Sequence, residues 1–390
     1  MPVLVVLALA CFVSSLSMRI VDPVVPAIAR DLGVEVSTAA LLASAFALPY
    51  ALSQLPIGTL GDAIGKARII KLSLVALVAS LLASTFAPTF EMLFAARVIA
   101  GISAGGIITL SFAIVGDRFP ADERQVALSR LLIAMLSSTL FGAVGTGLIA
   151  EQFGWRAVAV VVAVLTVLAL ALTLRFLPAG TRPAPVAFDL GRIRRDYLGI
   201  LAHPLAHVCY LGVFTEGILA FGFMPYIAAM LETRGLGGMR EAGFAIAGSG
   251  LGGLVYTVLV RILLDRLGRT QMVRAGGVLC LVGLGLMAVS HGWPAQMAAL
   301  FVLGLGFNPV HNSLQTTATD LAPEARGKAM AMHAFSFFLG MAAGPILYRI
   351  GFAVFGTPAT FAIAAIGLFA LAQWIAGRLE AHRISMIGVE

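Results

Sequence analysis

Residues 156–177 read RAVAVVVAVLTVLALALTLRFL, with no charged side chain between Arg156 and Arg175. The hydrocarbon core of a bilayer is about 30 Å thick, and an α-helix needs about 20 apolar residues to cross it. The segment is too long, and alternates too weakly, to be a strand of an outer-membrane barrel. It therefore predicts a membrane-spanning helix.

Apolar segments of this kind recur along nearly the whole chain. Of its 390 residues, 60% are hydrophobic and 12% are charged, whereas soluble domains carry about 25% charged residues. We therefore expect an all-α membrane protein with twelve transmembrane helices. The first segment is expected to be a retained helix, because no basic region precedes it as in a signal peptide. The predicted spans are residues 3–27, 39–60, 69–88, 91–116, 127–150, 156–177, 204–231, 242–264, 271–290, 294–318, 328–349 and 354–377.

The net charge of +7 raises the question of a nucleic-acid partner. If both termini are cytoplasmic, most Lys and Arg residues fall on the cytoplasmic side of the predicted helices or at its edge. This distribution follows the positive-inside rule, which explains the basic balance without nucleic acid. We expect a multi-pass protein of a bacterial inner membrane.

Two loop motifs occur twice, each time 203 positions apart. Residues 62–66, DAIGK, return as DRLGR at 265–269, and residues 117–120, DRFP, return as DLAP at 320–323. Two matches in the same register predict an internal repeat. We therefore expect two pseudo-symmetric six-helix bundles with the substrate site at their interface. The predicted boundaries are 1–178 for the first bundle, 179–203 for a cytoplasmic linker and 204–390 for the second bundle.

The loop Gly58-Thr-Leu-Gly-Asp62-Ala-Ile-Gly65-Lys66-Ala-Arg68 resembles motif A of the major facilitator superfamily, G-x-L-x-D-x-x-G-R/K-x-R/K. The resemblance implies that this loop is a conformational latch that helps to hold an outward-open state. A generic basic loop on the cytoplasmic side is the alternative. The predicted latch residues, including those of the repeated loop, are Gly58, Asp62, Gly65, Lys66, Arg68, Asp265, Gly268 and Arg269.

Further segments resemble the same superfamily and its drug and sugar efflux branch. Residues 97–101, RVIAG, look like motif B, R-x-x-Q-G, with alanine in place of glutamine. Residues 340–345, GMAAGP, resemble the G-x-x-x-G-P antiporter pattern, whereas the fifth predicted helix has Gly142 and Gly145 without the proline. Segments 22–33 and 221–227 look like the efflux branch. Small residues four apart also allow close helix packing, which we expect for Gly142, Gly145, Gly340, Gly344 and Pro345.

Only Asp22 and Glu216, among the acidic residues, fall well within predicted helices. A carboxyl that is alternately near to and away from an arginine can load and release a proton near neutral pH. We expect Asp22 and Glu216 to carry a coupling proton with the help of Arg19 and Arg97. Alternatively, Asp22 only neutralises one of these arginines, and Glu216 binds a cationic substrate or remains neutral and hydrogen-bonded.

The tenth predicted helix carries several polar side chains, which are costly in an apolar segment unless they meet a partner or a wet cavity. Asn308, Asn312 and Gln315 share one helical face. We expect this face to line a substrate pocket, with interhelical hydrogen bonding as the alternative. The predicted substrate-binding residues are Asn308, His311, Asn312, Gln315, His333 and Tyr226.

No Walker loop, nucleophile elbow or metal-ligand spacing occurs in the sequence. We therefore expect no metal, no cofactor and no enzymatic activity. The expected function is secondary transport of a small organic solute by alternating access, as proton-coupled efflux. Proton-coupled uptake of a metabolite, or a non-transporting receptor or lipid-handling protein on the same fold, are the alternatives. The expected partners are the substrate, protons and the lipid bilayer, with the chain acting as a monomer.

Overall fold

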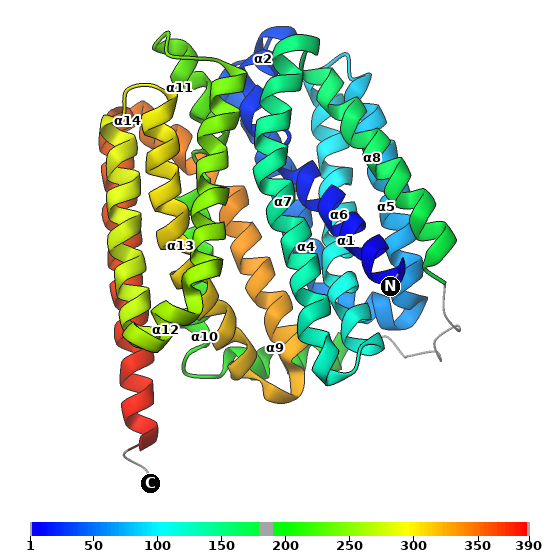
Figure 1. The fold of residues 1–390 in the computed structure, drawn as a ribbon, viewed down its shortest axis with the longest axis vertical. Helices are drawn as coiled ribbons and strands as arrows, with labels where there is room; N and C mark the ends of the chain where they lie inside the picture. The colour runs from blue at the N-terminus through cyan, green and yellow to red at the C-terminus, as the bar shows by residue number, and fades with distance from the viewer. Residues whose placement is uncertain (1, 179–189, 388–390) are drawn as a thin grey trace. The chain divides into compact units, whose positions relative to one another are not determined.

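The computed structural model describes residues 2–178 and 190–387, and helices account for nearly all of them (Figure 1). No β-strand occurs in these two ranges. Eight helical stretches are long and apolar enough to cross a membrane. The all-helical prediction is thus confirmed for the described residues. The predicted linker falls in part on residues 179–189, which lie outside them.

The chain forms two compact units. Unit 1 contains the helices of the first half together with Pro225–Glu232 and Gly238–Gly243, and unit 2 contains the other described residues from Gly191 onward. Short segments from the second half of the sequence thus pack with the first half. The boundaries at residues 178 and 203 remain a prediction.

Unit 1 is built from long helices joined by short turns. Its elements from the first half are α1 (Pro2–Arg19), η1 (Asp22–Val24), α2 (Val25–Asp31), α3 (Val36–Ala39), α4 (Leu41–Leu60), the π-helical turn η2 (Gly61–Gly65), α5 (Lys66–Thr85), α6 (Phe90–Arg118), α7 (Ala121–Phe153) and α8 (Trp155–Phe176). α6 packs against α4 and α5, while α1 packs against α7 and α8 (Figure 1). Polar residues in the middle of α6, such as Arg97, Ser103 and Ser111, are therefore enclosed by neighbouring helices.

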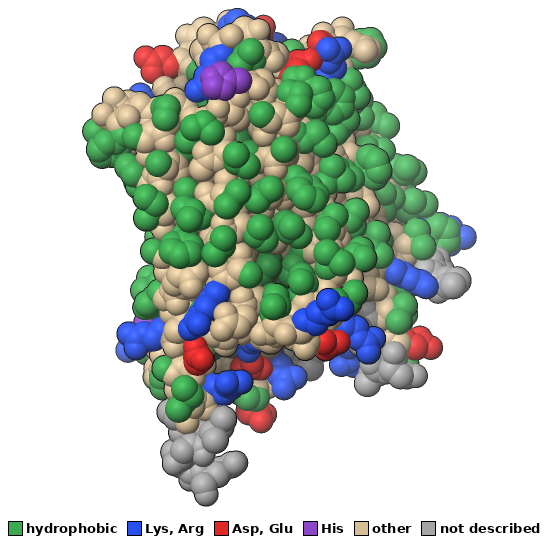
Figure 2. Space-filling view, turned by 60° about the vertical axis from the view of Figure 1, so that its left-hand side comes forward, with side chains coloured by type: hydrophobic (Ala, Val, Ile, Leu, Met, Phe, Trp, Pro, Cys, Tyr) green, Lys and Arg blue, Asp and Glu red, His purple; other side chains and the backbone are tan. Residues whose placement is uncertain are grey.

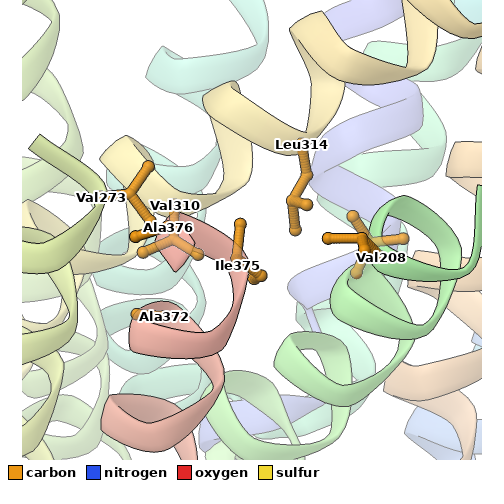
Figure 3. Packing of buried hydrophobic residues seen from close by; sticks show 8 residues of the cluster. Val208, Val273, Val310, Leu314, Ala372, Ile375 and Ala376 are labelled. Carbon is orange, nitrogen blue, oxygen red and sulfur yellow. The ribbon is translucent and has the colours of Figure 1, made fainter. Parts of the chain in front are cut away.

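The second half contains fewer but longer continuous elements. They are α9 (Leu190–Leu201), α10 (Ala206–Phe221), η3 (Met224–Tyr226), α11 (Ile227–Thr233), α12 (Met239–Val289), α13 (Trp293–Leu321), η4 (Pro323–Ala325) and α14 (Arg326–Ile387). α12 and α14 each join two helices across a kink, at Gly268 and Gly356. Apolar side chains from α10, α12, α13 and α14 meet in one buried cluster (Figure 3): Val208, Val273, Val310, Leu314, Ala372, Ile375 and Ala376.

Backbone geometry repeats between the two halves of the sequence. Gly33 and Gly235 both have φ of 64°, and Gly154 and Gly356 have φ of 80° and 76°. The members of each pair stand 202 positions apart. Left-handed backbone of this kind strains residues that carry a Cβ atom, so it marks turns that need glycine. The recurrence of the same turns at almost the offset of the loop motifs supports the internal repeat.

Asp22 does not lie within a continuous helix, contrary to the prediction. α1 ends at Arg19, and Asp22 begins the short 3-10 turn η1 before α2 starts. Pro23 explains the interruption, because proline has no backbone N–H to donate to the preceding turn. Pro225 occupies the corresponding place in η3 before α11. Both first helices of the repeat thus end in a break beside a proline.

Apolar side chains cover the middle of the face shown in Figure 2, and charged side chains gather toward its two ends. Val258, Phe141 and Val354 are 72%, 66% and 66% exposed. Apolar exposure of this kind suits a lipid-facing surface. α13 is not among the eight stretches that pass as spans by composition. Its polar side chains, such as Asn308 and Asn312, lower its mean hydropathy.

Glycines allow α14 to approach α10 closely. A Cβ atom on Gly340 would collide with the backbone carbonyl oxygen of Phe214, and one on Gly344 would lie 2.5 Å from the Cα atom of Gly222. Pro345 follows inside the same helix. These contacts fit packing through small residues.

The two glycines predicted to allow close packing of the fifth predicted span have different surroundings. A Cβ on Gly142 would lie 2.6 Å from Leu16 of α1, whereas nothing lies within 4 Å of one on Gly145. The structure thus gives no close contact that requires a glycine at position 145. Gly147, which the sequence did not single out, packs against the backbone of Met239 and Arg240.

We predict opposite effects on stability for two alanine substitutions in α14. Gly340→Ala should lower the free energy of unfolding by about 1–3 kcal/mol, because the added methyl group overpacks the contact with α10. Gly377→Ala adds the same group where nothing lies within 4 Å, and it should be neutral or gain up to about 1 kcal/mol from helix propensity. Thermal unfolding of both variants in detergent tests this. Equal melting temperatures would contradict the packing role.

Candidate functional site

A carboxyl group lies completely buried in unit 2. Glu216 of α10 is 0% exposed, and one of its oxygens contacts Nδ1 of His311 on α13. Its other oxygen has no hydrogen-bond partner among the described residues. A buried carboxylate without enough partners is costly, so such a group tends to hold a proton or a counter-charge. Glu216 and His311 can together share one proton.

A second histidine extends this pair. His333 of α14 is 3% exposed, and its ring centroid lies 5.1 Å from that of His311. Its Nε2 atom has no hydrogen-bond partner in the described part of the chain. Glu216, His311 and His333 thus lie side by side, with Glu216 and His333 buried and His311 half-buried, and we call them the Glu-His-His cluster.

Aromatic rings enclose the Glu-His-His cluster. Phe307 stacks on His311 at 5.1 Å, Phe337 lies 4.8 Å from the same ring, and Phe221 meets both phenylalanines edge-on. These rings exclude water and strengthen electrostatic interactions inside. Sequence reasoning missed them, although Phe307 and Phe337 each stand four residues from a histidine on the same helix.

The polar face of α13 is only partly enclosed. Asn308 is half-buried, donates to the carbonyl oxygen of Gly304 in its own helix at 2.7 Å, and lies against Gly253. Asn312 is also half-buried, and Gln315 is exposed. Tyr226 is buried in η3 and belongs to unit 1. A pocket lined by this face remains a prediction.

Unit 1 holds a separate set of buried charges. Asp22 is 3% exposed and pairs with Arg19 at 3.3 Å. Arg97 of α6, 2% exposed, donates to the carbonyl oxygens of Ser17 at 2.7 Å and Met18 at 3.2 Å. These carbonyls end α1, where the helix leaves acceptors unsatisfied and carries a partial negative charge. Arg97 therefore fixes the end of α1 beside Asp22.

Gln54 also joins two helices of unit 1, and sequence reasoning missed it. Its side chain is 1% exposed, donates to the carbonyl oxygen of Gly105 at 3.1 Å, and accepts a hydrogen bond from Thr109 at 2.7 Å. A Cβ atom on Gly105 would collide with Ser53. The interior of α6 is thus held to α4 by polar contacts and by close approach of the backbone.

The first latch loop forms an ion-pair cluster. The Nζ atom of Lys66 lies 2.6 Å from Asp117 at the end of α6 and 3.5 Å from Asp62. Gly65 has φ of 106°, which glycine adopts without strain. Arg68 is half-buried, and nothing lies within 4 Å of a Cβ on Gly58. Asp117 is the closer partner of Lys66, which the motif alone did not reveal.

The repeated loop is held differently. Arg269 donates to the carbonyl oxygen of Ser313 and to the hydroxyl of Thr317, each at 2.6 Å. Asp265 is exposed, and Gly268 has φ of 70°. Both turns contain a glycine with positive φ, but Arg269 is bound to α13 by hydrogen bonds rather than to two carboxylates. The two loops are therefore held in place by different kinds of interaction.

No group of three or more His, Cys, Asp or Glu residues within the described ranges could hold a metal ion. The chain's three cysteines, Cys11, Cys209 and Cys280, are free and buried. Buried thiols of this kind behave as small apolar side chains.

The Major Facilitator Superfamily profile matches residues 7–345 and 209–385, so the chain belongs to this family of membrane transporters rather than to a family of enzymes. The resemblance seen in the sequence motifs is confirmed. The family places the chain among proteins that carry small molecules across membranes.

Relatives with efflux names are similar over most of the chain. A chloramphenicol resistance protein of Streptomyces lividans is 28% identical, covering 88% of this chain and 87% of that protein. A probable sugar efflux transporter of Pasteurella multocida is 26% identical, covering 97% and 94%. A multi-drug resistance efflux pump homologue of Lactococcus lactis is also 26% identical, covering 87% and 85%.

Solved structures of similar fold include a D-xylose-proton symporter, with a TM-score of 0.76 and 16% identity over 96% of each chain. A peptide transporter has a TM-score of 0.80 and 15% identity over 97% of this chain and 94% of that one. At these identities the likeness establishes the fold alone.

We predict that removing the carboxylates around Lys66 slows transport without weakening substrate binding. Asp117→Asn and Asp62→Asn should each lower the turnover rate and leave substrate affinity within about a few-fold, because exposed ion pairs contribute only about 0–1 kcal/mol and act on the latch alone. The Asp117 variant should be the slower, since its carboxylate is the closer one. Glu123→Gln, exposed at the start of α7, is the matched control. A large loss of affinity in either variant would contradict the latch role.

Proposed function

We propose that the chain exports a small organic molecule by alternating access, in exchange for protons. Relatives that match most of the chain have names that include efflux or resistance. These names support export as the direction of transport. The Glu-His-His cluster supports the coupling, because Glu216 combines complete burial, a histidine partner and one free oxygen. A carboxyl in this setting gains free energy by taking up a proton and by releasing it when the surroundings change.

We further propose twelve transmembrane helices with both termini cytoplasmic, in a bacterial inner membrane. The number is supported when the stretch Val36–Thr85, α12 and α14 are each counted as two helices, and α13 is added to the eight stretches. The offset recurrence of turns and loop motifs supports two six-helix halves. The chain is proposed to act as a monomer.

Alternating access requires contacts that can break and form again. Within unit 1, Arg30 of α2 pairs with Glu232 of α11 at 2.5 Å, and Arg240 of α12 lies 3.5 Å from Glu151 of α7. Arg30 and Glu232 stand 202 positions apart, the same offset as the repeated turns. In the proposed topology these pairs lie at the end remote from the latch loops. These pairs are candidates for contacts that break and form again during transport.

The proposed substrate site lies on the polar face of α13 beside the Glu-His-His cluster. Asn308, Asn312 and Gln315 offer both hydrogen-bond donors and acceptors, and the phenylalanines offer apolar surface. Such a lining suits an amphipathic organic molecule. Asp22 with Arg19 is a second candidate for the coupling proton.

The test is transport by everted membrane vesicles with an imposed pH gradient, using a compound that the protein is found to carry. Glu216→Gln mimics the protonated carboxyl permanently, so downhill exchange should persist while uphill transport stops. Asp22→Asn applies the same test to Asp22, the second candidate for the coupling proton. His291→Gln is the matched control, because this histidine lies in the turn before α13, away from the cluster.

If Glu216→Gln and Asp22→Asn both still concentrate the compound when driven by a pH gradient, neither residue carries the coupling proton. Accumulation in the opposite orientation of the gradient would indicate uptake rather than efflux. Absence of transport in wild-type vesicles of either orientation, across a panel of amphipathic compounds and sugars, would favour a receptor or lipid-handling role.

A further inference from the structure

A cavity of about 530 Å³ lies within unit 2, apart from the Glu-His-His cluster. It is bounded by the turn between α9 and α10, the kink of α12, the end of α13 and the C-terminal part of α14. Its volume is that of a site for a small organic ligand or a lipid head group. Neither the latch nor the proton-coupling proposal uses it as a binding site.

The cavity is lined by two arginines, two carboxylates and two histidines. His203, Arg269, His382 and Arg383 line it, against the carboxylates of Asp320 and Glu380. Glu380 is paired outside the lining with Arg274 at 2.8 Å, which neutralises it. Counting that arginine, the fixed charges leave an excess of one cation before either histidine is protonated.

Two histidine rings lie close together in the cavity. The rings of His203 and His382 lie 5.9 Å apart, centroid to centroid. Burial, and then the nearby His382, lower the pKa of His203 below its ordinary value. His203 accepts a hydrogen bond on Nδ1 from the backbone N–H of Leu205 at 3.1 Å, so its Nε2 atom is the nitrogen that can donate to an anion. The other charged groups that face them are Arg269, Asp320, Glu380 and Arg383.

Apolar side chains complete the lining. Leucines from the same elements, including Leu205 and Leu379, share the cavity with the charged groups. A free inorganic anion would leave this apolar surface in water, whereas an amphiphile covers it. Basic pockets between transmembrane helices on the cytoplasmic side are typical sites for anionic lipid head groups.

We propose that this cavity binds a phosphate-bearing anion, whose phosphate contacts His203, His382 and Arg383 and whose apolar part covers the leucines. An anionic phospholipid carries both parts, and a soluble phosphate carries the first alone. The site is separate from the proposed substrate and proton sites. It places a ligand next to the Gly268–Arg269 turn that joins the two helices of α12.

The experiment compares the purified full-length chain with two variants. His382→Gln with Arg383→Gln removes both groups from the cavity, and Arg378→Gln removes an exposed cation of the same helix outside the lining. Native mass spectrometry measures binding of short-chain phosphatidylglycerol against phosphatidylcholine. Equilibrium dialysis measures binding of inorganic phosphate. Thermal unfolding checks that all three proteins are folded.

Phosphatidylglycerol should bind the double variant at least about fivefold more weakly than wild type at pH 7, as expected for one cation lost near an anionic head group. Arg378→Gln should bind as wild type does. The same pattern with inorganic phosphate, and not with the lipid, would assign the site to a soluble phosphate. Equal binding of both probes to wild type and double variant would overturn the proposal.

Discussion

The arrangement of unit 2 depends on the burial of one carboxyl group among apolar helices. Glu216 is enclosed by α10, α13 and α14, and its contact with His311 offsets part of the free energy lost on leaving water. Close approach of α10 to α14 at Gly340 and Gly344 brings His333 and Phe337 to the same place. The close packing of α10 against α14 and the burial of the Glu216–His311 pair are therefore linked, because the cluster lies where the glycines let the helices meet.

The buried charges of unit 1 have partners of a different kind. Arg97 satisfies the last carbonyl groups of α1 and lies 4.5 Å from the ring centroid of Phe46. A cation at a helix C-terminus is favourable because the helix dipole is negative there. Asp22 follows in the break created by Pro23 and pairs with Arg19. The charges of unit 1 thus stabilise a helix end, whereas one oxygen of Glu216 in unit 2 has no hydrogen-bond partner among the described residues.

Much of this fold could be predicted from local patterns in the sequence. Apolar runs such as residues 156–177 predict helices because bilayer thickness fixes their length. The repeated loops predict the internal duplication, since the turns at Gly65 and Gly268 need the same residue. The Glu216–His311 contact could not be predicted, because the two residues lie 95 positions apart and neither has a neighbouring motif. The break at Asp22 was missed because hydropathy is insensitive to a lost backbone donor at Pro23.

The claim that Glu216 exchanges a proton inside the membrane is tested most directly by infrared difference spectroscopy of the purified protein. Spectra recorded between acidic and alkaline pH should contain a band of a protonated carboxyl group that shifts in heavy water and disappears in Glu216→Gln. The same band should survive in Glu241→Gln, which alters a carboxyl at the start of α12. A spectrum in which Glu216→Gln and wild type have the same carboxyl bands would contradict the account.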